Sequence, residues 1–276
     1  MNSGLRNGTR PQRLQAIFFD WAGTTIDYGS RAPTEVFFEV FRRRDVEITP
    51  AEARGPMGMA KRDHLAAISA LPRVAEAWRA RYGSLPADAD IQRMYDEFLP
   101  LQYEVLKRGS DLIPGVVPVV DECRRRGLKI GSSTGYTREL MQLVAPIAAK
   151  QGYSPDVIVC PDEVRQGRPA PWLNFRIAEH LDIYPLDTVV VVDDTPVGIQ
   201  AGLNAGAWTV AISETGNSMG LSESEVAALP ESERQARLDS ITAEFLLCGA
   251  HYVIRSVADL PGVLDQITER LACHGA

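Results

Sequence analysis

Asp20 is the first residue in this sequence whose position suggests chemistry. It comes directly after the apolar residues 16–19 and begins the stretch Asp20-Trp21-Ala22-Gly23-Thr24-Thr25. A carboxylate in such a Gly/Thr turn would lie beside exposed backbone N–H groups, which bind phosphate oxygens well. A turn-forming aspartate at a strand end would explain Asp20 taken alone equally well.

Two adjacent carboxylates, Asp193 and Asp194, follow a second apolar stretch at residues 189–192. Neighbouring carboxylates at the end of a buried strand are costly unless a cation lies beside them. Mg2+ takes oxygen ligands, only a few of them from protein, and water and substrate phosphate complete its shell. The pair therefore predicts a magnesium site.

A third polar group, Ser132-Ser133-Thr134-Gly135-Tyr136-Thr137, follows the apolar residues 128–130. Hydroxyls and amides at a helix N-terminus suit an anion, although a simple helix cap would explain the same residues. In open α/β sheets, ligands bind at the carboxyl ends of the strands. Since all three polar groups follow strand-like stretches, we expect them to meet at one site.

Lysine is rare in this chain, which has only Lys61, Lys107, Lys129 and Lys150 among 29 basic residues. Arginine stays protonated at working pH, whereas lysine can become a neutral amine. Each lysine therefore raises a chemical question, and Lys61 is the only one in the first 106 residues. His64 follows three residues later, so on a helix the two side chains would share a face.

Six short stretches have the length and the β-branched or aromatic content of buried strands: residues 16–19, 128–130, 157–159, 189–192, 208–212 and 252–254. Strands buried on both faces are typical of a parallel sheet covered by helices. Helix-like segments alternate with them at residues 117–126, 137–150, 172–181 and 197–205. This alternation predicts an α/β fold, a doubly wound Rossmann-like core around a parallel sheet.

Residues 30–106 interrupt this alternation and look helical throughout. We expect helices that begin at Pro33, that cover residues 61–71 and that cover residues 91–107, the last one kinked or split at Pro100. The sequence thus predicts a helical cap domain at 30–106, inserted into a core made of 14–29 and 107–276. Residues 1–13 are expected to be a disordered tail.

The composition excludes several classes of protein. The net charge of −7 offers no basic surface for nucleic acid, and no apolar run approaches the length of a membrane-spanning helix. The four cysteines and four histidines have no metal-binding spacing. Free thiols in a reducing compartment are the simplest interpretation, so we expect a cytoplasmic protein that binds neither nucleic acid nor membrane.

The three polar groups, with a basic residue in Gly167-Arg168-Pro169, resemble the four motifs of the haloacid dehalogenase superfamily. The resemblance implies that Asp20 is a nucleophile that becomes an aspartyl phosphate. It also implies that Thr134 is the hydroxyl of the second motif, Arg168 the basic residue of the third and Asp194 a metal ligand.

Two positions depart from the pattern of most phosphatases and mutases of this superfamily. Ala22 stands where they carry a second aspartate as general acid and base, and Gly198 stands where a later acid is expected. A phosphate-ester hydrolase without the acid at position 22 would lack a proton donor for its leaving oxygen. A capped phosphatase or phosphomutase therefore remains an alternative that the sequence disfavours.

The phosphonatase branch of the superfamily resembles this chain over roughly residues 14–255. The shared stretches are Asp20 to Thr25, Asp27-Tyr28-Gly29, Pro56-Met57-Gly58 with Lys61 and His64, Thr134 to Arg138, Gly167 to Trp172, and Asn204 to Val210. The resemblance implies hydrolysis of the C–P bond of phosphonoacetaldehyde in 2-aminoethylphosphonate degradation. A C–P bond has no leaving oxygen to protonate, and an iminium formed on Lys61 would accept its electrons.

The resemblance also implies roles for further residues and a partner. His64 would shuttle protons and Met57 would take part from the cap loop, while Gly58, Gly135 and Tyr136 would join Thr134 and Arg168 in binding the substrate. Mg2+ would be held at Asp20, Ala22 and Asp194, and the protein would be a homodimer through its cap.

Some interpretations stay open. Asp193 would tune the metal or bind it through water, Tyr136 would line the pocket or only pack, and His64 is alternatively a surface or interface histidine. A binding protein without catalytic activity is a further alternative. Retention of the whole set of reactive residues, Asp20, Lys61, Thr134, Arg168 and Asp194, argues against it.

Overall fold

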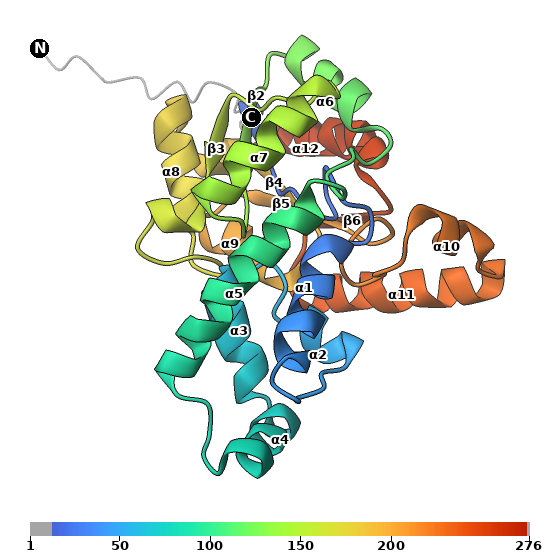
Figure 1. The fold of residues 1–276 in the computed structure, drawn as a ribbon. Coiled ribbons are helices and arrows are strands. Elements are labelled where there is room, and N and C mark those ends of the chain that lie inside the picture. The colour runs from blue at the N-terminus through green and yellow to red at the C-terminus, as the bar shows by residue number, and fades with distance from the viewer. Residues whose placement is uncertain (1–12, 275–276) are drawn as a thin grey trace, which may run out of the picture.

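The computed structural model describes residues 13–274 (Figure 1). Residues 1–12, most of the predicted tail, and residues 275–276 lie outside this range. The centre of the described chain is a six-stranded parallel sheet with the order β3-β2-β1-β4-β5-β6. The strands are β1 (Ala16–Phe19), β2 (Lys129–Ser133), β3 (Val157–Val159), β4 (Val189–Asp193), β5 (Trp208–Ile212) and β6 (Tyr252–Ile254).

The central strand β1 explains why the three predicted polar groups meet. Its register pairs Phe19 with Ser132 of β2 and with Val192 of β4. Because the strands are parallel, the residues that follow all three leave the sheet at the same edge. Asp20, Thr134 and Asp194 are thereby neighbours.

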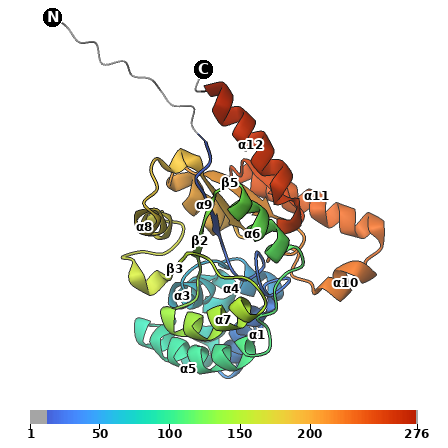
Figure 2. The same ribbon diagram turned by 90° about the horizontal axis from the view of Figure 1, so that it is seen from above.

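Helices cover both faces of the sheet, as the predicted doubly wound fold requires (Figures 1 and 2). Alternate strand residues such as Ile17 and Val190 face one hydrophobic core with α6 (Val116–Arg125), α7 (Arg138–Lys150) and α12 (Leu260–His274). Phe18 and Val191 face the opposite core with α8 (Trp172–Leu181). The α/β fold class is confirmed.

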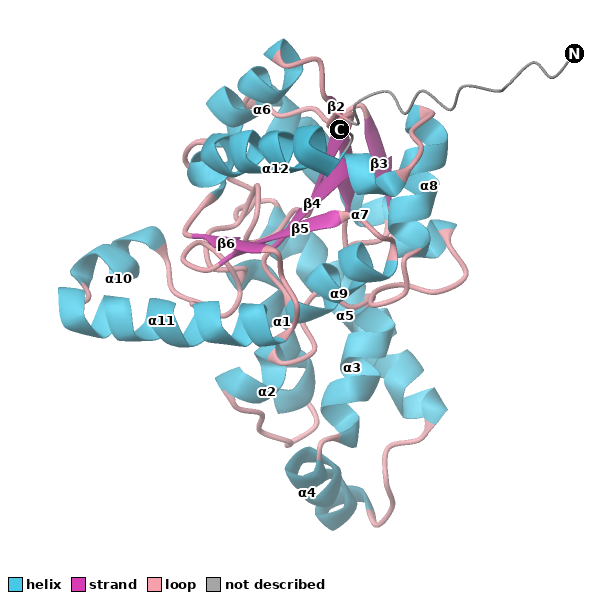
Figure 3. Cartoon of the chain, turned by 180° about the vertical axis from the view of Figure 1, so that it is seen from behind, coloured by secondary structure: helices cyan, strands magenta, loops and turns pink. Residues whose placement is uncertain are grey.

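Two further groups of helices complete this half of the chain. Helix α9 (Pro196–Asn204) contacts β4 and β5, and α11 (Glu231–Leu247) contacts β6. With α10 (Glu223–Ala228), α11 forms a hairpin that projects beside β6 (Figure 3). Three short 3-10 helices, Pro161–Glu163, Leu186–Thr188 and Val257–Asp259, lie in the connections.

Five of the six helices between β1 and β2 form a separate body beneath the sheet in Figure 1. They are α1 (Arg31–Arg42), α2 (Pro50–Arg54), α3 (Lys61–Ala70), α4 (Pro72–Tyr82) and α5 (Asp88–Leu106), and we call them the cap. The cap has its own hydrophobic core around Val36, Phe37, Val40 and Phe41. Where the domains divide remains a prediction.

Several details differ from the sequence-based expectations. Helix α1 begins at Arg31 rather than Pro33, and α2, α4, α11 and α12 were not predicted. Of the kink or split expected at Pro100, the split is wrong, because α5 runs unbroken through this residue. Pro100 is exposed, and buried Met94, Phe98 and Leu106 anchor the helix on both sides. No helix within residues 13–274 is long and apolar enough to span a membrane.

Candidate active site

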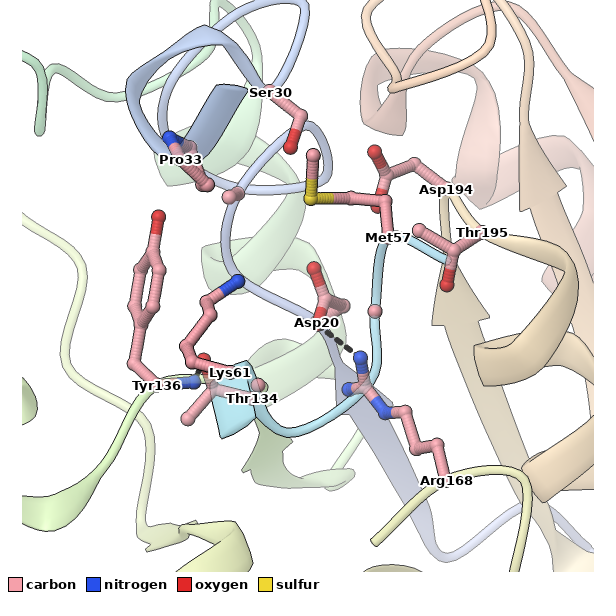
Figure 4. Close-up of a pocket in the computed structure, with 13 residues that line it drawn as sticks. Asp20, Ser30, Pro33, Met57, Lys61, Thr134, Tyr136, Arg168, Asp194 and Thr195 are labelled. Carbon is pink, nitrogen blue, oxygen red and sulfur yellow. Dashed lines mark hydrogen bonds and ion pairs between the residues drawn. The ribbon is translucent and has the colours of Figure 1, made fainter. Parts of the chain in front are cut away.

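One cavity at the carboxyl edge of the sheet collects most of the predicted site residues (Figure 4). It lies between the core and the cap, and its empty volume, with the open solvent at its mouth, is about 270 Å3. Its lining residues are Asp20, Ala22, Ser30, Pro33, Met57, Gly58, Lys61, Thr134, Gly135, Tyr136, Arg168, Asp194 and Thr195. Ser30, Pro33 and Thr195 were not predicted, and His64 does not line the cavity.

Asp20 is held at the end of β1 by its own backbone and by the turn that follows. Its N–H donates to the Val192 carbonyl at 2.9 Å, and the Thr25 hydroxyl donates to the Asp20 carbonyl at 3.0 Å. Gly23 in this turn has φ of +86°, and a Cβ there would collide with the Asp194 carboxylate. The glycine therefore lets the turn after β1 approach the end of β4.

The three aspartates Asp20, Asp193 and Asp194 form a buried cluster whose oxygens lie within 4.8 Å of one another. Burial raises the pKa of Asp20 to about 7, although the Arg168 charge opposes the shift. Burial and the charges of Asp20 and Asp193 raise the pKa of Asp194 well above its usual value. Such a concentration of carboxylate oxygens fits a hard divalent cation, whose charge would relieve the repulsion.

Arg168 is the cation that reaches farthest into this acidic cluster. It is 5% exposed, with Nη1 at 2.8 Å from Asp20 Oδ1 and Nη2 at 3.3 Å from Asp193 Oδ2. Nη2 also donates to the Ser133 hydroxyl at 2.6 Å. Ser133 lies inside β2, which extends three residues beyond the predicted strand. These contacts orient the guanidinium beside the nucleophile that the sequence predicts.

Asp193 lies behind the cavity rather than in its lining. Its Oδ1 accepts hydrogen bonds from the Thr195 backbone N–H at 2.9 Å and from the Thr195 hydroxyl at 2.7 Å. The Asp193 carboxylate also fills the space where a Cβ at Gly198 would stand. Gly198 thus leaves the room that the Asp193 carboxylate occupies, and a side chain at this position would displace it. Asp193 contacts Arg168 and the start of α9.

Lys61 is the first residue of α3 and points from the cap into the cavity. Figure 4 shows its amine between the Tyr136 ring and Asp20. The Nζ atom lies 5.1 Å from the Tyr136 ring centroid and 5.8 Å from that of Phe37. Burial lowers the pKa of Lys61 to about 8, although the Asp20 charge opposes the shift. A neutral amine, the form that attacks a carbonyl carbon, is therefore accessible near neutral pH.

His64 lies one turn further along α3, fully buried beneath Lys61. Its ring stacks on Phe37 with centroids 3.9 Å apart, and Nε2 lies 2.8 Å from the Ala53 carbonyl. Since a carbonyl can only accept, Nε2 carries the proton and Nδ1 is left as a free base. Burial lowers the pKa of His64 well below its usual value. The histidine is neutral, and the alternative of a surface position is excluded.

The loop between α2 and α3 covers the cavity from the cap side. Met57 is 3% exposed, and Gly58 has φ of +91°. A Cβ at Gly58 would collide with the Thr195 hydroxyl, and a Cβ at Gly135 would lie 2.8 Å from the Met59 carbonyl. Because glycines stand at positions 58 and 135, the cap loop can pack closely against the core at Thr195 and at Gly135.

The hydroxyl of Thr134 remains available at the end of β2. Its Oγ1 accepts a hydrogen bond from the Tyr136 backbone N–H at 3.0 Å, so its own proton is free to donate. The buried Tyr136 hydroxyl has no hydrogen-bond partner among the described residues. Both groups line the cavity and could bind oxygen atoms of a ligand.

The chain belongs to the haloacid dehalogenase-like hydrolase family, whose model matches residues 14–206. It is 48% identical over 261 residues to a phosphonoacetaldehyde hydrolase of Paraburkholderia xenovorans, covering 95% of this chain and 98% of the relative. It is 43% identical over 258 residues to one of Bacillus anthracis, covering 94% and 98%. The family predicted from the sequence is confirmed.

Two further similarities add to this result. A bifunctional phosphonoacetaldehyde hydrolase/aminoethylphosphonate transaminase of Clostridioides difficile is 43% identical over 256 residues, 93% of this chain and 40% of the relative. The crystal structure of a phosphonoacetaldehyde hydrolase-like protein from Oleispira antarctica matches with a TM-score of 0.93 and 39% identity, covering 99% and 98% of the two chains. The likeness therefore extends over the cap as well as the core.

Proposed function

We propose that this protein hydrolyses the C–P bond of phosphonoacetaldehyde to acetaldehyde and phosphate. The observation that carries the proposal is the buried amine of Lys61, with its pKa lowered to about 8, in one cavity with the Asp20 carboxylate. Ala22 leaves the site without a carboxylic acid for a leaving oxygen. The names of the relatives at 43–48% identity support the same reaction.

The reaction begins on Lys61. Its neutral amine attacks the aldehyde carbon, and loss of water gives an iminium in which the phosphorus-bearing carbon is adjacent to the C=N carbon. Asp20 then attacks phosphorus, and the electron pair of the C–P bond moves into an enamine. Protonation of the enamine carbon and hydrolysis of the imine release acetaldehyde, while water hydrolyses the aspartyl phosphate on Asp20.

The core side of the cavity would bind the phosphonate group. Arg168 reaches into it beside Asp20, and the free Thr134 hydroxyl proton can donate to a phosphonate oxygen. Gly58, Gly135 and Tyr136 line the same cavity and are proposed to bind the substrate, with Met57 closing it from the cap. We further propose that the His64 Nδ1 base moves protons for Lys61 during imine formation.

Mg2+ is the proposed cofactor. Asp20 and Asp194 would hold it through carboxylate oxygens, and Ala22 can contribute only its backbone carbonyl oxygen. When bound, the ion would neutralise charge where the phosphonate meets the carboxylates. The raised pKa values of Asp20 and Asp194 support this assignment, because both carboxylates need a nearby cation to stay ionised.

The decisive assay compares two substrates. We expect acetaldehyde release from phosphonoacetaldehyde and little phosphate release from a sugar phosphate. The reverse result would favour the phosphatase or phosphomutase alternative. A place in 2-aminoethylphosphonate degradation is proposed with the activity, and the transaminase named in the C. difficile relative supports it.

A cytoplasmic location and a homodimer through the cap are also proposed. All four cysteines are free thiols, which suits a reducing compartment. On the cap, Tyr82, Leu85 and Tyr103 are exposed large hydrophobic residues. Light scattering on the wild type and a Tyr82→Ser/Leu85→Ser variant tests the dimer; an unchanged dimer in the variant would move the interface elsewhere.

A further inference from the structure

Arg54, the last residue of cap helix α2, extends its side chain across to the core. Its Nη1 donates to the Gly29 carbonyl at 2.9 Å and to the Asn217 carbonyl and Oδ1 at 3.2 and 3.1 Å. Its Nη2 donates to the Gly220 carbonyl at 3.1 Å. In return, Asn217 Nδ2 donates to the Arg54 carbonyl at 3.1 Å. One cap residue thus binds a core loop, residues 215–220, from both its side chain and its backbone.

The core loop is shaped to receive this guanidinium. Gly220 has φ of +66°, and a Cβ there would lie 2.8 Å from Arg54 Cζ. Other cap arginines bond differently: Arg44 pairs with Glu97, and Arg73 pairs with Glu52 and the Glu47 carbonyl, all within the cap. Arg54 therefore makes contacts that hold the cap to the core, whereas Arg73 stabilises only the cap.

Arg54 and Asn217 are also hydrogen-bonded to two residues that line the cavity. The Asn217 backbone N–H donates to Asp194 Oδ2 at 2.7 Å. The Arg54 carbonyl, which binds Asn217, also accepts the Met57 N–H at 3.0 Å. Asp194 and Met57 both line the cavity, one from the core and one from the cap, and lie near each other in Figure 4. Arg54 and Asn217 contact neither the cavity nor Lys61 directly, so any influence on the reaction acts through these neighbours.

We propose that Arg54 and Asn217 form a latch that holds the cap closed over the cavity and positions Met57 and Asp194 for the reaction. This deepens the proposed function and rests on it for the kinetic effect. The guanidinium donates charge-assisted hydrogen bonds, which are stronger than neutral ones. Opening the cap breaks all of them together and exposes the amine of Lys61.

Chemical labelling tests the latch without substrate. Lys61 is 4% exposed, and the exposed Lys107 serves as an internal reference in the same molecule. Acetylation by sulfosuccinimidyl acetate is followed at each lysine by peptide mass spectrometry. We expect Arg54→Met to raise the Lys61 acetylation rate about tenfold, as loss of charged hydrogen bonds predicts, and to leave Lys107 unchanged. The matched control Arg73→Met leaves both rates unchanged.

Kinetics then separate positioning from simple stability. We expect Arg54→Met and Asn217→Ala each to lower kcat/KM about tenfold. The double variant should be no worse than either single variant, because both substitutions disrupt the same latch. Arg54→Lys should restore part of the loss, and it replaces Arg54→Met if the latter fails to fold. Unchanged Lys61 labelling in the Arg54 variant, or strictly additive kinetic losses, would overturn the latch. If the wild type does not release acetaldehyde, the proposed function fails while the labelling result still decides the latch.

Discussion

The core and the cap supply chemically opposite walls to one cavity. The core wall carries Asp20, Asp194 and Arg168, with Asp193 buried behind them. The cap wall carries one amine, Lys61, near aromatic rings. The same burial shifts both groups toward neutrality, raising the pKa of Asp20 to about 7 and lowering that of Lys61 to about 8.

Burial therefore has opposite consequences for the two reactive groups. The proposed reaction needs an ionised Asp20 and a neutral Lys61. Burial favours the neutral amine directly, whereas the carboxylate needs cations beside it to stay charged. The core accordingly places Arg168 and a candidate metal site at Asp20, and the cap places no carboxylate in the lining of the cavity.

The largest expected effect comes from removing the nucleophile of the core wall. Asp20→Asn should lower kcat for acetaldehyde release by about 10^4-fold or more, because no aspartyl phosphate can form. Asp121→Asn, which alters an exposed carboxylate on α6, is the matched control and should be unaffected. Near-normal turnover by Asp20→Asn would remove Asp20 from the mechanism.

Metal removal tests the acidic cluster as a whole. EDTA should lower activity by at least about 100-fold, since a bound cation contributes several kcal/mol at developing charge. Added Mg2+ should restore activity, and calorimetry should show Mg2+ binding that Asp194→Asn weakens. Full activity in chelator would refute the metal assignment and leave the cluster dependent on Arg168 alone.

The contact between the two walls is tested at Gly58. Gly58→Ala adds a Cβ that collides with the Thr195 hydroxyl, so the cap loop must move away and kcat/KM should fall roughly tenfold. Gly83→Ala is the control, because Gly83 has φ of +80° but nothing within 4 Å of the added Cβ. Each substitution should lower the unfolding free energy by about 1 kcal/mol from backbone strain. Equal kinetic effects would show that strain, not the contact, matters.

The smallest effect is the pH dependence of Lys61. With a pKa of about 8, the neutral fraction of the amine rises about fivefold from pH 7 to pH 8 and then levels off. The rate of imine formation with phosphonoacetaldehyde should follow this curve and reach a plateau above about pH 9. An ordinary lysine would instead keep gaining through pH 10. A continued rise in rate would show that burial does not activate the amine.

The core wall could be predicted from the sequence more completely than the cap wall. Asp20, Thr134 and Asp194 follow buried strands, and parallel pairing brings strand ends together whatever the details of the helices. Lys61 was found because lysine is rare here. Asp193 was noticed in the sequence, but only the structure shows that its carboxylate packs against Gly198.

The contacts between the walls could not be predicted. Arg54 and Asn217 are 163 positions apart, and no local pattern of residue types marks such a pair. Ser133 was missed as a partner of Arg168 because the strand was expected to end earlier. His64 was expected to shuttle protons, but its ring packs on Phe37 and does not line the cavity. The sequence could not show this, since the tertiary fold decides which side chains of α3 reach the cavity.

Borohydride trapping tests the central claim, a covalent imine on Lys61, most directly. The protein is incubated with phosphonoacetaldehyde and borohydride, digested, and mapped by mass spectrometry at all four lysines. We expect a reduced adduct on Lys61 alone, with loss of activity, and neither adduct nor turnover in Lys61→Arg, which keeps the charge but cannot form the imine. Lys107→Arg should behave as the wild type. Normal turnover by Lys61→Arg, or an adduct on another lysine, would contradict the account.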